Sequence, residues 1–577
     1  MHDLPGSKRS SQGDADSLPL HAKAVTGTID YAGLSRLPYA TEVVRENARL
    51  ALEWTYDPTR YEALLATGRC RNNRSQCRIP DPDVEIMVAL RKYEAAERAQ
   101  IRAVGIGFTV PEWAKKRRRA VYEPYINDCF TNVPTVAFRT RDTRLRLLRK
   151  FTNGWAAAID LAAYYDQFAL SPAVRPYFGL QTKAGFLQAT TLPMGFRPSC
   201  AVAQWVTWLL VDLPPQADVE IMTYIDNIMV VSRTPEGVKR TMATIIARCK
   251  QVGVVINDVD QPCNPVQKIE FLGELIDFKQ GTVALAAKTV EKLKVVQAWA
   301  STVNSSRREW VIVPATNRQV TATVSLLLFA ADVLDISTLD FYHTMQMYRL
   351  ACHIGSLGGW ESKHATIRTA TWNNLMAWLS KAISNTPRPL PADAPSKPHD
   401  KIIFVDACAT GWGAVTISNG MAHVTSGPWP EHLAPHMKSS VSAEPEAMVR
   451  AVFAATDACT KRILVVSDHQ PLVYAAAKPH RAARAWAYNH ALWRLHKHLP
   501  GVHIDVAFIQ GHLNPGDKPS RGARMTTEDF KQLSEQVEKF TTENKSENGK
   551  TGKSPEWAQT ALNPIRHRHL SHKTSFG

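Results

Sequence analysis

The sequence predicts an α+β protein of several domains, and three observations indicate this. A chain of 577 residues is too long for one hydrophobic core, since single cores stop growing at roughly 250–300 residues. Short β-branched apolar runs alternate with longer stretches of helical spacing. Five prolines between Pro387 and Pro398 separate a long first part from a shorter second part, and both parts contain apolar runs that end in a carboxylate.

Composition and charge narrow the class of protein. Hydrophobic residues make up 45% of the chain and aromatic residues 8%, which is typical of a folded protein and excludes a disordered one. The net charge of +16 favours a polyanionic partner, nucleic acid first, over a merely soluble basic protein. Nine cysteines without a CxxC pair indicate free thiols in a reducing compartment. With no signal peptide and no long apolar run, we expect a cytoplasmic or nuclear, non-secreted protein with no membrane partner.

The chain before residue 110 carries no recognisable chemistry. Residues 1–38 are polar and lack a sustained period, so we expect a disordered leader. Residues 39–109 form a predicted helical extension. Helical spacing runs from Thr41 to Tyr56, and a second helix is expected from Asp83 to Val104, which is rich in Ala, Glu and Arg.

A predicted hairpin over Val219–Val231 stands at the centre of the sequence. Two apolar runs flank a polar pair, so the tip is expected near Asp226 and Asn227. A carboxylate among so much hydrocarbon is unfavourable unless a cation compensates it, and an ordinary surface turn is the alternative. The upstream run Trp155–Asp160 also ends in a carboxylate. Two strands that bring Asp160 and Asp226 together would form a site for a hard cation such as Mg²⁺.

Basic residues precede this predicted site. Residues 101–150 contain twelve Lys or Arg against four Asp or Glu. The run Lys115–Arg119 could present guanidinium groups to phosphates, or it could be a solvated charge run or a nuclear-import signal. A second set between Arg139 and Lys150 precedes the strand that ends at Asp160, which favours a polyphosphate or nucleic-acid substrate.

Two polar residues near the predicted site read as helix caps. Asp166 follows Asp160 by six residues, and capping a helix is favoured over a third ligand role. The loop Thr191–Cys200 contains Pro and Gly, and Ser199 is expected to cap the helix that follows.

The order of these motifs resembles the core of reverse transcriptases. The resemblance is carried by Asp160 with Tyr165 and Gln167, by the Leu192–Phe196 loop with Gln204, and by Tyr224–Asn227. Phe271–Ile276 resembles the primer-grip segment of such enzymes. The family implies a right-hand polymerase with fingers, palm and thumb. Fingers and palm would span residues 110–285, and residues 286–397 would form the thumb and connection.

The resemblance also implies roles for individual side chains. Asp160 and Asp226 would be catalytic and would hold two Mg²⁺ ions, with Mn²⁺ as a possible substitute, beside a DNA primer on an RNA template. Tyr165 occupies the place of a side chain that crowds a 2′-hydroxyl, which implies dNTPs as substrates. For Tyr165 and Arg118 a packed ring and a solvent-facing side chain are the alternatives. Metal binding extends to Leu161. Nucleotide binding is implied for Arg118, Arg119, Leu161, Tyr165, Met194, Gly195 and Gln204, and nucleic-acid contact for Lys115, Lys116, Arg117, Phe271, Leu272 and Gly273.

One position departs from the family pattern. The family usually has a second Asp after Asp226, and this chain has Asn227. The neutral amide removes a negative charge that would help to hold a divalent cation, while Asn suits a tight turn as well as Asp does. We expect reduced or Mn²⁺-favouring activity rather than none.

The segment after the predicted palm reads as helical. Lys288–Ser301 has the pattern of an amphipathic helix and Val320–Val333 that of a buried one. In retroelement enzymes this region grips the primer–template, although plain helical packing explains the sequence equally well. Cys352 and His353 have no neighbours that would complete a zinc site.

Residues 398–525 predict a separate α/β domain after a helical connection, and the motifs below resemble those of a ribonuclease H-like domain. Lys401–Asp406 and Ile463–Asp468 are apolar strands that each end in a carboxylate, and Glu444 opens a helical stretch. Four acidic residues resemble the catalytic and metal-binding set of retroelement ribonuclease H, namely Asp406, Glu444, Asp468 and Asp517. Glu446 competes with Glu444, which is preferred because alanines follow it at three and seven residues. His512 lies near the family's catalytic-loop histidine, with a plain surface histidine as the alternative.

These patterns together predict a retrotransposon enzyme that copies RNA or DNA into DNA and degrades the RNA of RNA–DNA hybrids, both by two-metal-ion catalysis. The run Asp406–Ala414 and the compact Asn514–Arg521 ending resemble the tyrosine-recombinase (DIRS-like) group, and within it the trypanosomatid VIPER branch. Other proteins of the element are further expected partners. Residues 526–577 predict one short helix and a disordered basic tail. The rival hypotheses are a non-catalytic nucleic-acid-binding scaffold that keeps both folds, and a ribonuclease H with an inactive polymerase half.

Overall fold

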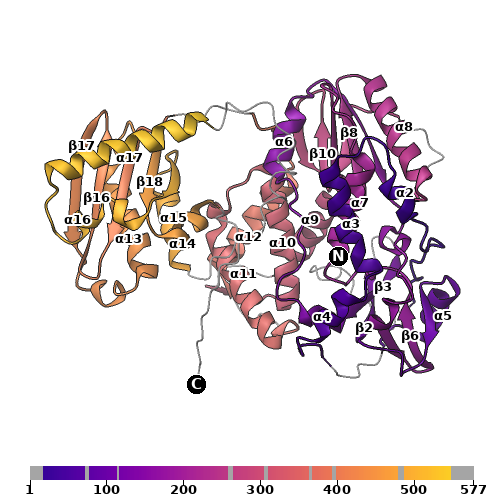
Figure 1. Ribbon diagram of the computed structural model, residues 1–577. Coiled ribbons are helices and arrows are strands. Elements are labelled where there is room, and N and C mark those ends of the chain that lie inside the picture. The colour runs from indigo at the N-terminus through magenta and orange to yellow at the C-terminus, as the bar shows by residue number, and fades with distance from the viewer. Residues whose placement is uncertain are drawn as a thin grey trace.

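The fold has three parts that follow one another along the chain. In Figure 1 the elements from β15 (Lys401–Ala407) onward form one end of the molecule, the elements up to β10 (Glu274–Asp277) form the other, and helices α9 (Ala287–Ala300) to α12 (Thr369–Ile383) lie between them. The computed structural model describes residues 17–71, 77–112, 116–257, 264–303, 309–362, 367–392, 398–477 and 486–546.

The N-terminal segment packs against the first part of the fold. Its helices are α2 (Tyr31–Ser35), α3 (Glu42–Leu52), α4 (Thr59–Leu65) and α5 (Asp81–Ala89). Ile29, Leu34 and Leu37 are buried in the same core as the palm strands. The expectation of a disordered leader is therefore wrong for residues 17–38, because three apolar side chains anchor an otherwise polar segment. Residues 1–16 lie outside the described part of the chain.

The fingers contain a five-stranded sheet in the order β1-β6-β5-β2-β3. The expected helix over Asp83–Val104 is wrong beyond α5, because Tyr93–Ala96 pairs antiparallel with Gly185–Ala189 and this pairing overrides the helix propensity of Ala and Glu. The strands of the fingers sheet are β1 (Tyr93–Ala96), β2 (Val104–Glu112), β3 (Arg117–Pro124), β5 (Gly179–Thr182) and β6 (Gly185–Ala189).

The palm is a three-stranded antiparallel sheet in the order β4-β8-β7, and it confirms the predicted hairpin. Its strands are β4 (Trp155–Asp160), β7 (Val219–Tyr224) and β8 (Asn227–Ser232). The central strand β8 is buried on both faces, because alternate side chains point to opposite sides of a strand. Ile228 and Val230 pack with helices α7 (Ser199–Val211) and α8 (Pro235–Gln251), while Met229 and Val231 pack with α6 (Arg141–Arg149) and α9.

Two expected helix caps in this region are wrong. Residues 164–167 form only a 3₁₀ turn, in which Asp166 makes an ion pair with the buried Lys92. Ser199 is the first residue of α7 and not its cap. Its hydroxyl donates to the carbonyl oxygen of Pro193 at 2.6 Å, which closes the preceding loop.

The middle part combines a small sheet with a helical bundle. The sheet has the order β14-β11-β10-β9, and its strands are β9 (Lys268–Phe271), β10, β11 (Thr282–Leu285) and β14 (Arg388–Pro389). Helices α9, α10 (Asn317–Leu334), α11 (Tyr342–Ile354) and α12 share one core with this sheet, so both expected helices are confirmed. A short ribbon pairs β12 (Trp310–Val311) with β13 (Ile367–Arg368). The proline-rich segment is not all linker, since β14 joins the sheet.

The C-terminal part is a five-stranded mixed sheet in the order β17-β16-β15-β18-β19. One face packs on α13 (Ser440–Ala455), α14 (Gln470–Ala477) and α15 (Trp486–His498), and the other face on α17 (Thr527–Ser546), as Figure 1 shows. The one helix predicted after residue 526 is α17, which is longer than expected, and Leu533 anchors it because this side chain is buried against the sheet. Residues 547–577 are outside the described structure. The strands are β15 (Lys401–Ala407), β16 (Gly411–Ser418), β17 (Met421–Pro428), β18 (Arg462–Ser467) and β19 (His503–Phe508).

The middle and C-terminal parts touch through an aromatic contact. Tyr342 stacks on Trp493 with ring centroids 4.7 Å apart, and His496 Nε2 lies 2.6 Å from Asp340 Oδ1. Among the helices of the described residues, none combines the length and apolar composition that crossing a bilayer requires.

Candidate active sites

The structure brings the two predicted palm carboxylates together. Asp160 is the last residue of β4 and stands opposite Asn227 in the ladder, while Asp226 lies in the two-residue turn before β8. The amide of Leu161 donates to the carbonyl oxygen of Asp226 at 2.8 Å, which ties the end of β4 to the hairpin tip. Burial raises the pKa of Asp226, and the charge of Asp160 raises it further. The tip is Ile225-Asp226, one residue earlier than expected.

Each palm carboxylate accepts a hydrogen bond from one amide side chain. Asn227 Nδ2 donates to Asp226 Oδ1 at 2.9 Å, and Asn257 Nδ2 donates to Asp160 Oδ2 at 2.6 Å. Two half-buried carboxylates form an oxygen-only donor set, which is the set that a hard divalent cation prefers. The residues present therefore fit a metal ion of the Mg²⁺ type.

The hairpin tip is supported from below by Gln204. Ile225 has a positive φ of 54°, which is unfavourable for a β-branched residue and has to be held by its surroundings. Its amide donates to Gln204 Oε1 at 2.6 Å, and Gln204 Nε2 donates to Thr223 Oγ1 at 3.1 Å. Gln204 is fully buried and is absent from the cleft wall, so its predicted contact with the nucleotide is replaced by a positioning role.

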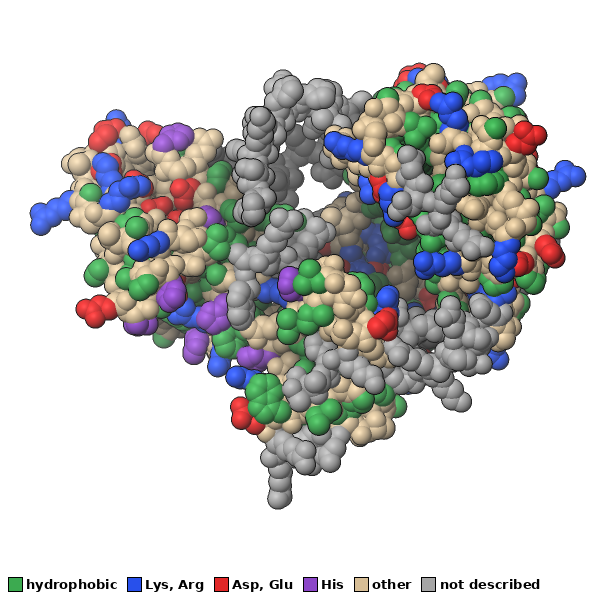
Figure 2. All heavy atoms as spheres, turned by 90° about the horizontal axis from the view of Figure 1, so that it is seen from below, with side chains coloured by type: hydrophobic (Ala, Val, Ile, Leu, Met, Phe, Trp, Pro, Cys, Tyr) green, Lys and Arg blue, Asp and Glu red, His purple; other side chains and the backbone are tan. Residues whose placement is uncertain are grey.

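A cleft of about 1080 Å³ opens above the carboxylates, between the fingers and the palm. Figure 2 shows Lys and Arg side chains inside a hollow of the surface. Burial raises the pKa of the Tyr165 phenol, so this side chain is neutral in the cleft. The residues predicted from the sequence that line the cleft are Arg117, Arg119, Asp160, Leu161, Tyr165, Met194, Asp226, Phe271 and Leu272.

The arginines of β3 divide between two faces, because a strand alternates its side chains. Arg118 is buried and pairs with Asp83 of α5 at 2.8 Å, so it does not face the cleft as predicted. Arg117 and Arg119 point the other way, line the cleft and pair with Glu112 at 2.5 and 3.2 Å. Lys116 is exposed in the turn before β3, and the predicted residue Lys115 lies outside the described residues.

Gly195 does not reach the cleft wall either. A Cβ at this position would collide with the carbonyl oxygen of Tyr122, so glycine allows the loop to pack directly on β3. Asn127 holds the same loop, because its Nδ2 donates to the Gly195 carbonyl oxygen at 2.8 Å and its Oδ1 accepts from the Arg197 amide at 3.0 Å. No pattern in the sequence indicated this role for Asn127.

The predicted primer-grip segment is a hairpin between β9 and β10. Leu272 and Gly273 both have positive φ, 50° and 82°, which is the turn that closes a two-residue hairpin. Phe271 and Leu272 line the cleft, whereas a Cβ on Gly273 would lie 3.1 Å from the Phe329 ring. The fully buried Glu274 follows and accepts from two arginines of α6.

These arginines belong to the second basic set, which the sequence placed on the approach to the metal. Arg141 Nε and Arg144 Nη2 each lie 2.6 Å from Glu274 Oε1. Arg139 pairs with Glu220 at 2.5 Å. These members of the set are therefore held in internal ion pairs that fix the β9–β10 hairpin and the palm.

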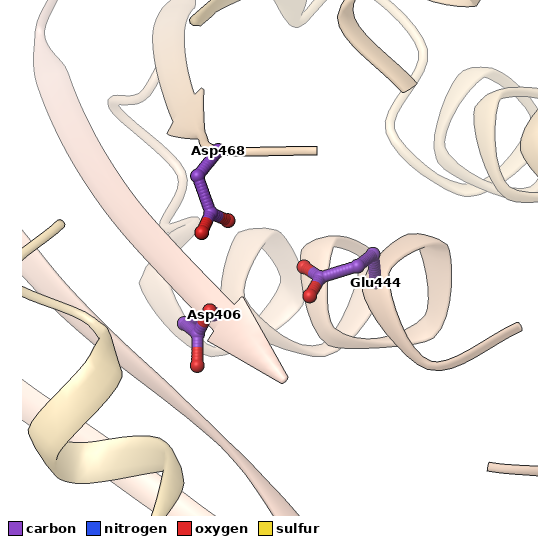
Figure 3. Close-up of side chains that lie close together, drawn as sticks. All are labelled: Asp406, Glu444 and Asp468. Atoms are coloured by element: carbon purple, nitrogen blue, oxygen red, sulfur yellow. The ribbon is translucent and has the colours of Figure 1, made fainter. Parts of the chain in front are cut away.

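A second carboxylate group lies in the C-terminal domain. Asp406 on β15, Glu444 on α13 and Asp468 after β18 offer oxygen atoms within 4.8 Å of one another, and Figure 3 shows the three side chains converging. This group could hold a metal ion. Glu446 is not part of it, because it pairs with Arg450 at 3.0 Å and Arg494 at 2.5 Å.

Electrostatics in this group favour a bound cation. Burial, with the charges of Asp406 and Asp468, raises the pKa of Glu444 to about 9, and burial raises that of Asp406 to about 6. Glu444 Oε2 is buried and has no hydrogen-bond partner in the described structure. Ser520 Oγ donates to Asp406 Oδ2 at 2.6 Å. The sequence did not single out Ser520.

The other two predicted residues of this site lie at its rim. Asp517 starts the short helix α16 (Asp517–Ser520) and pairs with Arg521 at 2.8 Å, while its charge helps to raise the pKa of Asp406. His512 is exposed in a loop that passes close to Asp468, since a Cβ on its neighbour Gly511 would lie 2.8 Å from Asp468 Oδ2.

The fold and the first site define the class of this part of the chain. A palm with two carboxylates at its hairpin tip, facing an arginine-bearing fingers sheet, is the architecture of a template-directed polymerase. Residues 108–274 match the reverse transcriptase (RNA-dependent DNA polymerase) family, so the chain contains a reverse transcriptase domain. The predicted resemblance is confirmed for this domain.

Solved structures with some similarity include foamy viral protease–reverse transcriptases. One, in complex with double-stranded DNA, is 14% identical at a TM-score of 0.41 and covers 76% of this chain and 72% of that chain. A complex with an RNA/DNA hybrid is 15% identical at a TM-score of 0.41, covering 76% of this chain and 55% of that one. A further complex with double-stranded DNA is 13% identical at a TM-score of 0.41 and covers 88% of this chain and 98% of that chain. No curated protein matches the chain.

Proposed function

We propose that this chain is a retrotransposon polymerase that copies RNA, and then DNA, into DNA and degrades the RNA strand of the hybrid. One observation carries the proposal: Asp160 and Asp226 meet at the base of a cleft within a reverse transcriptase domain. The substrates would be an RNA template, a DNA primer and dNTPs. The run Asp406–Ala414 supports an origin in a DIRS-like element.

The palm residues would act on a primer terminus held in the cleft. Asp160 and Asp226 would hold two Mg²⁺ ions, which when bound supply a lowered pKa at the primer 3′-hydroxyl and charge compensation at the leaving pyrophosphate. Arg117 and Arg119 line the same cleft and present guanidinium groups, which suit phosphate oxygens. Tyr165 narrows the cleft as a neutral ring, which favours deoxynucleotides.

The C-terminal carboxylates would hydrolyse the RNA strand of the hybrid. Asp406, Glu444 and Asp468 would hold two further Mg²⁺ ions with help from Asp517 at the rim, and bound metal supplies an activated water and charge compensation. The unpartnered Oε2 atom of Glu444 and the raised pKa values support this assignment, because a buried carboxylate without a cation is unfavourable.

Primer extension on an RNA template tests the polymerase. We expect Asp226→Ala to abolish extension with Mg²⁺ and with Mn²⁺, since it removes half of the carboxylate pair. Asn227→Asp should keep or raise extension with Mg²⁺. Binding of the primer–template, measured in parallel, should be unchanged. Extension by Asp226→Ala at the wild-type rate would refute the assignment.

Hybrid cleavage tests the second site. Asp468→Ala and Glu444→Gln should abolish cleavage of the RNA strand and leave extension intact. Glu446→Gln is the matched control, because this residue lies two positions away in a structural ion pair and should retain cleavage. Equal loss of cleavage and extension in Asp468→Ala would point to misfolding and count against a separate hydrolytic site.

Asn227 is the observation that favours the alternative, a nucleic-acid-binding scaffold without polymerase activity. The two hypotheses differ in one result. A scaffold binds hybrid but extends no primer with either metal, whereas the proposed enzyme extends with at least Mn²⁺. Cleavage without extension would identify a ribonuclease H with an inactive polymerase half.

A further inference from the structure

The segment before the reverse transcriptase domain forms part of the cleft wall. The carbonyl oxygen of Pro19 accepts from the Arg118 amide at 2.9 Å, and the His21 amide donates to the Arg118 carbonyl oxygen at 2.6 Å. These bonds attach the segment to β3. The four residues that follow Pro19 line the cleft, namely Leu20, His21, Ala22 and Lys23.

Lys23 carries a cation close to the palm carboxylates. Its ammonium group donates to Asn257 Oδ1, and Asn257 Nδ2 donates to Asp160 Oδ2 at 2.6 Å. Within the described ranges of the chain, Lys23 makes no ion pair with a carboxylate. Lys92, by contrast, also lines the cleft but is neutralised by Asp166. The charge of Lys23 is therefore available to a ligand in the cleft.

His21 positions a second cation in the cleft, the guanidinium group of Arg117. Burial and the charges of Arg117 and Arg119 lower the pKa of His21 to about 4, so the ring is neutral near pH 7. Its Nδ1 accepts from Arg117 Nη1 at 2.9 Å, which holds this guanidinium toward the cleft. Arg117 and Arg119 share the single carboxylate of Glu112, so the two guanidinium groups together keep one net positive charge. The N-terminal segment thus contributes one cation and orients another.

We infer that Lys23 binds the triphosphate of the incoming nucleotide, together with Arg117 and Arg119 of β3. A nucleoside triphosphate carries more negative charge than two divalent ions between two carboxylates neutralise, so further cations on the cleft wall are required. Lys23 comes from the N-terminal segment and both arginines come from β3. The backbone hydrogen bonds between these two elements hold all three residues in one wall of the cleft. This inference rests on the proposed polymerase function.

Nucleotide binding by a stalled complex tests the inference. The full chain is bound to a primer–template whose primer ends in a dideoxynucleotide, and the Kd for the next correct dNTP is measured. Lys23→Met keeps the hydrocarbon stem and should raise this Kd about tenfold, as expected for loss of one charge-assisted bond. Lys23→Arg should restore most of the affinity. Lys183→Met is the matched control, since Lys183 is exposed and pairs with Asp81 outside the cleft.

The outcomes separate the inference from the proposed function. A Lys23→Met Kd equal to wild type, with normal extension, would overturn the inference alone. A fall in kcat with an unchanged Kd would overturn it too, because Lys23 would then act through Asn257 on Asp160. If the wild type binds dNTP in a Lys23-dependent manner but never extends the primer, the inference stands and the polymerase function fails. Inorganic triphosphate should compete with dNTP about tenfold less well in Lys23→Met than in wild type.

Discussion

Replacing Asn227 by Asp should make the stability of the palm depend strongly on a divalent cation. The structure gives two reasons. The substitution removes the amide that donates to Asp226 Oδ1 at 2.9 Å, and it places a third carboxylate beside Asp160 and Asp226. Both changes disfavour the metal-free fold, and the second favours a bound cation.

The magnitude follows from these contacts. A hydrogen bond to a charged group contributes about 1.5–3 kcal/mol. Two unit charges about 4 Å apart repel by about 4 kcal/mol at an effective dielectric constant of 20, and protonation of one carboxyl relieves part of this. We expect the metal-free variant to lose on the order of 3 kcal/mol, which lowers Tm by about 6–12 °C for a domain of this size.

Thermal unfolding with and without Mg²⁺ is the assay. In a chelator, Asn227→Asp should unfold well below wild type. Added Mg²⁺ should raise its Tm more than it raises that of wild type, because a ligand that binds only the folded state stabilises it in proportion to the logarithm of its affinity. Asn132→Asp is the control, since it makes the same charge change at an exposed loop position.

Two results would refute this reasoning. If Asn227→Asp unfolds at the wild-type temperature in chelator, the amide of Asn227 does not support Asp226 as the structure indicates. If the Mg²⁺-dependent gain equals that of wild type, the third carboxylate does not reach the cation, and the palm is not the metal site that we propose.

Three further predictions concern residues that the structure repositions. Gln204→Leu leaves the amide of Ile225 unpaired beneath the hairpin and should lower the free energy of unfolding by about 1–3 kcal/mol with a reduced kcat for extension; unchanged urea unfolding would contradict the support role. In metal-free protein, Glu444 binds its proton more tightly when folded than when unfolded, so unfolding free energy should fall as pH rises from about 4.5 to about 9. Glu444→Gln should flatten this slope in urea titrations at pH 5, 7 and 9, and an unaltered slope would exclude Glu444 as its source. Arg118→Met leaves the buried Asp83 unpaired and should lower the free energy of unfolding by about 3–5 kcal/mol without changing the KM for dNTP. Arg119→Met should raise the KM for dNTP and leave the free energy of unfolding unchanged. If urea unfolding and steady-state kinetics instead show a raised KM in Arg118→Met and lost stability in Arg119→Met, Arg118 contacts the nucleotide as the sequence predicted.

The palm could be predicted from the sequence because its strands have an unambiguous pattern. Apolar runs that end in Asp160 and flank Asp226 leave few arrangements other than adjacent strands, and the structure has them adjacent. The C-terminal strands before Asp406 and Asp468 were predictable for the same reason. In each case the chemistry follows directly from the end of a buried strand.

Other features depended on contacts that a local pattern does not contain. Tyr93–Ala96 has helix-forming residues, and only its pairing with β6 makes it a strand. Residues 17–38 are polar on average, and their order depends on a few buried side chains. The sequence preferred Glu444 over Glu446 from the spacing of the following alanines, but it did not contain the reason, which is that Arg450 and Arg494, the latter 48 residues away in the chain, hold Glu446 outside the carboxylate group.

The alternation of side chains along β3 explains why Arg117 and Arg119 line the cleft while Arg118, which was predicted to face it, is buried. The sequence shows three consecutive arginines and does not say which face of the strand looks toward the cleft. The partner of Arg118 is Asp83 on α5, a helix whose packing could not be foreseen. Pairing with that helix fixes Arg118 inside the protein and thereby turns Arg117 and Arg119 toward the cleft.

The attachment of residues 19–21 to β3 affects how the enzyme should be truncated for laboratory work. β3 is the outer strand of the fingers sheet, and the N-terminal segment covers part of its open edge. A recombinant fragment that starts at residue 108, where the family match begins, would uncover this edge and the apolar pocket that holds Leu34 and Leu37. Uncovered strand edges favour self-association. Expression vectors for this polymerase should therefore retain the chain from residue 17 onward.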